Sequence, residues 1–117
     1  MKIENKCTAC VAIGNKAYVG LFNNEIPQEM ENDFTDKRID VGISIGEDAK
    51  VEASNGLSIG MQTCVLSAGG ISIGTFATVG KGSYAGIAIG LFAKAKSWNS
   101  LSIGYKAEIP AGASNAI

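Results

Sequence analysis

Hydrophobic and polar positions alternate along this chain in a short motif that recurs and always ends in glycine. An isoleucine precedes each glycine, a small residue precedes the isoleucine, and another aliphatic residue precedes both. The copies are VAIG at 11–14, ISIG at 43–46, LSIG at 57–60, ISIG at 71–74, IAIG at 87–90 and LSIG at 101–104. The closing glycines are 32, 14, 14, 16 and 14 residues apart. This spacing indicates a 14-residue repeat with one long and one short insertion.

A second motif follows with the same period. Three residues after each closing glycine stands an alanine or threonine, and two residues later an aliphatic residue. The pairs are Ala17 and Val19, Ala49 and Val51, Thr63 and Val65, Ala77 and Val79, Ala93 and Ala95, and Ala107 and Ile109. Period-two alternation bounded by glycine is typical of strands and turns. Each repeat therefore predicts two short strands, and stacked repeats predict an all-β parallel β-roll solenoid with 14-residue coils.

Strand alternation also assigns side chains to faces. We expect the aliphatic residues of both motifs to fill the interior, so that the small residue inside each tetrad points outwards. A stripe without long polar side chains favours tight packing against identical chains, although serine and alanine are also tolerated on a free surface. A small core with exposed end strands likewise favours a closed symmetric assembly. The expected subunit interface consists of Ala12, Ser44, Ser58, Ser72, Ala88 and Ser102.

The tetrads VAIG, ISIG, LSIG and IAIG, followed by alanine and valine at 14-residue spacing, resemble the head repeats of the YadA-like trimeric autotransporter adhesins. The resemblance covers about 42–109, with 10–22 as an isolated copy. It implies a left-handed β-roll that associates as a homotrimer. Similar rolls also occur in phage fibres and spikes. Since no signal peptide, heptad stalk or membrane anchor is recognised in the sequence, we expect a head fragment or a small stand-alone protein.

The expected domain organisation is an N-terminal segment at 1–9 and a β-roll at 10–117, with an acidic loop inserted at 23–40. Loops on rigid scaffolds often carry binding functions, so Phe34 in this loop is a candidate partner-binding residue. A solvated excursion is the alternative. Phe92 and Trp98 occupy turn positions near the shorter insertion. They are further candidates for partner binding, or they close the seam between subunits.

Composition argues against several function classes. Lys and Arg total 10 against 11 Asp and Glu, so the charge gives no reason to expect nucleic acid as a partner. No apolar run is long enough for a membrane span. The chain has no histidine, which removes the commonest general base and metal ligand. We therefore expect no enzyme activity, no metal and no cofactor.

Cys7 and Cys10 form a C-x-x-C pair, but zinc needs about four ligands, so a packed free thiol is expected at Cys10.

The competing fold is the hexapeptide left-handed β-helix of acyltransferases. Ile45, Val51 and Leu57 are spaced by six residues, as that fold requires. The six-residue spacing is then interrupted by two residues at each coil, so that a coil has 14 residues and not the 18 that three equal faces require. Those enzymes also use a catalytic histidine, which this sequence does not have.

The function expected from these observations is a non-enzymatic trimeric surface module for adhesion or receptor binding. Its partner would be a protein or glycan receptor, and its location the cell surface. The alternative is a phage virion structural protein, such as a head fibre, decoration protein or tail spike, that binds another capsid or tail protein.

Overall fold

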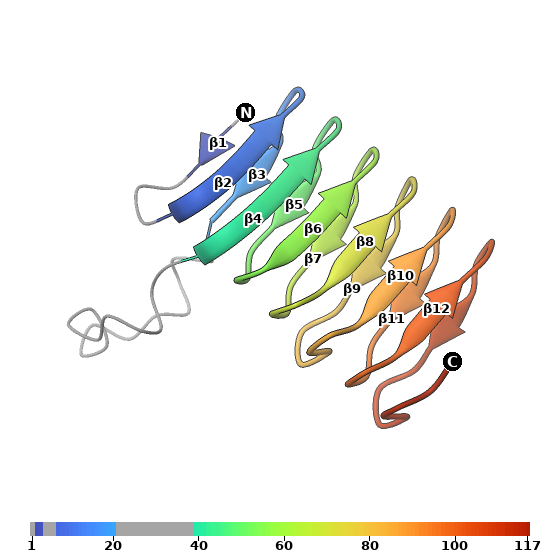
Figure 1. Cartoon of the computed structure of the whole chain (residues 1–117). Coiled ribbons are helices and arrows are strands. Elements are labelled where there is room, and N and C mark those ends of the chain that lie inside the picture. Colours follow the sequence, from blue (N-terminus) through green and yellow to red (C-terminus); the bar gives the residue numbers. More distant parts are fainter. Residues whose placement is uncertain (1, 4–6, 21–38) are drawn as a thin grey trace.

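A computed structural model describes residues 2–3, 7–20 and 39–117 of the chain (Figure 1). This part consists of strands and turns, and the strands alternate between two parallel sheets. Sheet A has the order β1 (Lys2–Ile3), β3 (Tyr18–Val19), β5 (Lys50–Val51), β7 (Cys64–Val65), β9 (Thr78–Val79), β11 (Lys94–Ala95) and β13 (Glu108–Ile109). Sheet B has the order β2 (Cys7–Ile13), β4 (Ile39–Ile45), β6 (Gly56–Ile59), β8 (Ile71–Ile73), β10 (Ile87–Ile89) and β12 (Leu101–Ile103).

The tetrads form sheet B and the alanine-valine motifs form sheet A, as predicted. Equivalent residues of successive repeats pair directly, so Ser44 lies beside Ser58, and Ser58 beside Ser72. The predicted all-β parallel solenoid with a spacing of about 14 residues is therefore confirmed. β4 begins at Ile39, inside the range expected for the acidic loop, while 23–38 and the candidate Phe34 lie outside the described residues.

The closing glycines are required by backbone geometry at the turn that follows each tetrad. Gly90 has a φ of 130°, which side chains rarely permit. A Cβ at Gly90 would also lie 2.6 Å from the carbonyl oxygen of Gly104 in the next coil. The stacked coils approach one another so closely here that only glycine fits.

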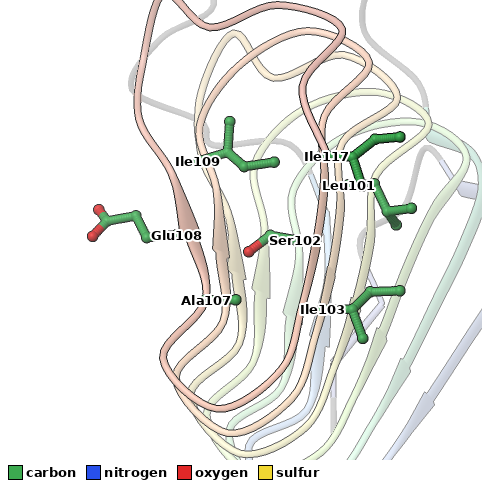
Figure 2. A pocket seen from close by; sticks show the side chains of 7 residues that line it. All are labelled: Leu101, Ser102, Ile103, Ala107, Glu108, Ile109 and Ile117. Atoms are coloured by element: carbon green, nitrogen blue, oxygen red, sulfur yellow. The ribbon is translucent and has the colours of Figure 1, made fainter.

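The structure corrects the expected assignment of faces. The small tetrad residues Ala12, Ser44, Ser58, Ser72, Ala88 and Ser102 are buried inside the coil, so they cannot form a subunit interface. The aliphatic residues on either side of them point outwards. Figure 2 shows this in the last coil, where Ser102 points inwards with Ala107 and Ile109 while Leu101 and Ile103 point away.

The small residues are needed because the interior is narrow. The valines of sheet A are fully buried and fill most of it. A Cβ at Gly56 would lie 2.6 Å from Cγ1 of Val51, and one at Gly70 would lie 2.8 Å from Cγ1 of Val65. Some of the inner hydroxyls bond locally: Ser44 Oγ donates to the Ala49 carbonyl at 2.6 Å, and Ser58 Oγ and Thr63 Oγ1 are 2.5 Å apart. An isoleucine on the inner face of sheet B would therefore overpack the coil.

Among the described residues, two turns that follow strands of sheet A are widened, and a serine in the preceding coil holds each one. Ser67 Oγ donates to the Gly80 carbonyl at 2.6 Å and accepts from the Ser83 amide at 2.9 Å. Ser97 Oγ makes the equivalent bonds with the Pro110 carbonyl and the Ala113 amide. The sequence indicated only the first of these insertions, because the chain shows no closing glycine after Gly104.

Candidate functional site

An exposed apolar surface covers the outer face of sheet B. We call it the isoleucine face, and its members are Val11, Ile13, Ile43, Ile45, Leu57, Ile59, Ile71, Ile73, Ile87, Ile89, Leu101 and Ile103. All are partly or largely exposed, up to 59% at Ile103. Since parallel sheets are normally covered on both faces, a continuous apolar strip of this kind is a candidate interaction surface.

Two pairs of aromatic side chains lie on opposite edges of the solenoid. We call the turns after the tetrads the tetrad edge and the turns from sheet A back to sheet B the wide edge. On the tetrad edge, Phe76 and Phe92 stack with ring centroids 4.9 Å apart and an interplanar angle of 5°. On the wide edge, Tyr84 and Trp98 meet edge to face at 5.4 Å and 82°.

These positions confirm that the candidate residues Phe92 and Trp98 lie in turns. Their side chains are 39% and 55% exposed. They lie on opposite edges of the roll, because the turn after β10 leads from sheet B to sheet A and the turn after β11 leads from sheet A back to sheet B (Figure 1). Tyr84, which was not among the expected partner-binding residues, is the aromatic neighbour of Trp98. The position of Tyr84 within the shorter insertion could have indicated from the sequence that it belongs to this site.

A cavity of about 250 Å³ opens at the C-terminal end of the roll (Figure 2). It is lined by Leu101, Ser102, Ile103, Ala107, Glu108, Ile109 and Ile117. The hydroxyl of Ser102 is buried there without a hydrogen-bond partner. Glu108 points to the other side and accepts from Lys96 Nζ at 2.6 Å. The lining residues therefore juxtapose no nucleophile and base, and the cavity is the open end of the core.

Two titratable groups have pKa values shifted by their surroundings, Glu108 and Cys64. The hydrogen bond and positive charge of Lys96 lower the pKa of Glu108, which lies at the surface. Burial, together with the negative charge of Glu52, raises the pKa of the Cys64 thiol to about 11. Cys64 is thus a protonated thiol at neutral pH. Cys10 is disulfide-bonded, so the expectation of a packed free thiol at that position was wrong.

Within the described ranges, no cluster of three or more His, Cys, Asp or Glu side chains is arranged to hold a metal ion. The same residues include no helix of the length and apolarity that a membrane crossing requires. No family model, curated protein or solved structure matches the chain. The candidate site is therefore defined by its own geometry: an apolar outer sheet face, flanked by two edges with exposed aromatic side chains.

Proposed function

We propose that the chain is a non-enzymatic β-roll module that assembles as a homotrimer and presents its edges to a receptor, as in an adhesive surface head. The observation that carries the proposal is the isoleucine face. Burial of such a strip between copies stabilises an assembly by about 25 cal/mol per Å² of apolar surface. The small serine and alanine residues of the tetrads are not part of the proposed interface, because they lie in the interior of each chain.

The choice of three copies and of a left-handed roll rests on the resemblance of the tetrads to the YadA-like head repeats. The position of the isoleucine face on one side of the roll supports a closed assembly, but it does not set the number of copies. A strip on one face of a rigid rod can be covered completely when identical rods pack side by side around an axis. Their turn edges then remain available at the outside or line the seams.

The adhesive role is supported by the exposed side chains at these edges. The turns are held by a regular backbone ladder, for example from the Phe92 amide to the Thr75 carbonyl at 3.0 Å. A rigid scaffold with exposed aromatic groups binds partners at a low cost in conformational entropy. Three copies of one edge would in addition provide multivalent attachment.

The test uses two matched variants in one coil, Ile73→Glu on the outer face of sheet B and Thr78→Glu on the outer face of sheet A. We expect Ile73→Glu to give monomers and Thr78→Glu to leave the trimer intact, as measured by light scattering after gel filtration. Adhesion to mammalian cells and to immobilised matrix proteins is then compared for the two variants. We expect Ile73→Glu to bind at least tenfold more weakly, because avidity is lost. A trimer that adheres to none of these surfaces would contradict the adhesive role, and a monomeric unaltered chain would contradict the assembly.

A further inference from the structure

The wide edge brings together two aromatic rings and two carboxamides from successive coils. Tyr84 and Trp98 are 50% and 55% exposed although their rings are in contact. Asn99 follows Trp98 directly, and Asn115 lies beside it in the next coil. Asn99 Nδ2 donates to Asn115 Oδ1 at 3.1 Å.

The backbone fixes these four side chains in register. The Asn99 amide donates to the Tyr84 carbonyl at 2.9 Å, and the Asn115 amide donates to the Trp98 carbonyl at 2.8 Å. Asn99 and Asn115 both have the left-handed conformation, with φ of 48° and 62°, which asparagine tolerates better than most residues. The edge is thus preorganised, and a ligand would not have to order a flexible loop.

The polar groups of this edge are amides that keep free hydrogen-bonding capacity. A carboxamide has two N–H donors and an oxygen with two acceptor sites. After the bond between them, Asn99 retains its oxygen and Asn115 retains its amino group. The segments 97–99 and 113–116 contain no charged residue. The nearest charged side chains along the chain are Lys96 and Glu108, which pair with each other, and Lys81 before Tyr84. The edge therefore suits a neutral ligand with many hydroxyl groups.

We propose that this wide-edge cluster, Tyr84, Trp98, Asn99 and Asn115, binds a neutral glycan. The C–H face of a sugar ring packs on the exposed aromatic surface of Trp98, while neighbouring hydroxyls bond with the free amide groups of Asn99 and Asn115. The amides favour a sugar over an apolar or proline-rich peptide, which would leave them without partners. This inference rests on the proposed function, since it names the class of receptor.

The experiment applies the assembled full chain to a printed array of neutral and sialylated oligosaccharides, with a proline-rich peptide spotted beside them. We expect binding to one or more neutral glycans. Trp98→Ala should weaken that binding at least tenfold and Asn99→Ala several-fold. Thr78→Ala, which changes a side chain on the outer face of sheet A, away from both edges, is the control and should bind like the unaltered chain.

The mass of each variant is measured by light scattering in parallel. Retention of the trimer in Trp98→Ala, with glycan binding lost, supports the inference. If Trp98→Ala abolishes assembly, the cluster is a seam between copies and the inference is overturned, while assembly through the isoleucine face stands. Absence of binding to all neutral glycans, preference for the peptide, or equal loss in Thr78→Ala would also overturn it. The proposed assembly is tested separately by Ile73→Glu.

Discussion

The two sheets of this solenoid have similar inner faces and very different outer faces. Inside, both present small or β-branched residues that are almost completely buried. Outside, sheet A presents polar or charged groups in most coils, namely Tyr18, Lys50, Thr78, Lys94 and Glu108, whereas the isoleucine face of sheet B is aliphatic throughout. Both sheets have the same hydrogen-bonded ladder, so they differ in the surface that they expose. Sheet A is suited to water, and sheet B is suited to another protein surface.

The largest effect is expected from a charge placed on the inner face of sheet B. Ser72 is fully buried and its hydroxyl has no hydrogen-bond partner, so the amine of Ser72→Lys would be buried without compensation. We expect a loss of about 4 kcal/mol in the free energy of unfolding. Thr78→Lys, on the outer face of sheet A, should change it by about 0.5 kcal/mol or less. Urea unfolding followed by circular dichroism measures both, and equal midpoints would mean that Ser72 does not face the interior.

The next effect tests the close stacking of coils at the tetrad edge. Gly90→Ala combines an unfavourable φ with a contact of 2.6 Å to the Gly104 carbonyl oxygen, and we expect a loss of about 3 kcal/mol. Gly82→Ala is the control, because Gly82 also has a positive φ, 76°, but no atom lies within 4 Å of its Cβ position. It should cost about 1 kcal/mol. Thermal unfolding distinguishes the two, and a Gly82→Ala variant as unstable as Gly90→Ala would exclude stacking as the cause.

A smaller effect is expected at the serine that holds the first widened turn. Ser67→Ala removes the side-chain hydrogen bonds to the Ser83 amide and the Gly80 carbonyl, which keep only the longer bond to each other at 3.3 Å. This should destabilise the chain by about 1 kcal/mol. Ser97→Ala should have a similar effect at the second widened turn, whereas Ser114→Ala, at an exposed position, should have almost none. Hydrogen exchange of the turn amides locates the change. Unaltered protection at Ser83 in Ser67→Ala would contradict this role.

The smallest effect concerns the ion pair on the outer side of sheet A. Lys96 lowers the pKa of Glu108 in the folded chain below its ordinary value of 4.5. The pair therefore stabilises the fold above that pH, and this stabilisation is lost as the pH falls through the lowered pKa. Glu108→Gln should reduce the melting temperature slightly at pH 7 and not at pH 2, and added salt should diminish the difference. A reduction of equal size at both pH values would show that the charge is not responsible.

The contrast between the sheets also explains what the sequence could and could not predict. Repeat length, strand positions and parallel register follow directly from the spacing of the tetrads, because each closing glycine marks an obligatory turn. The faces were assigned wrongly because aliphatic residues were placed inside by default. That rule fails where the outer face of a sheet is itself apolar. A signal was present, since Gly56 and Ser58 share a face of their strand, and residues so small in equivalent positions of most coils indicate a narrow interior.

The candidate site was predictable only in part, because the positions of its side chains depend on the exact ends of strands and the lengths of turns. Phe92 and Trp98 were recognised as turn residues, but the edge on which each lies depends on where the strands end. The pairing of Asn99 with Asn115 depends on a second widened turn, which was not recognised. The matching serines Ser67 and Ser97, 30 residues apart, were the available sign of this longer repeat.

The measurement that tests the central claim most directly is the mass of the full chain in solution over a wide range of dilution. Light scattering should give three times the chain mass of 12.1 kDa, with Ile73→Glu giving a single chain of unchanged circular dichroism. A folded protein of 12.1 kDa at all concentrations, with the isoleucine face in contact with water, would contradict the account.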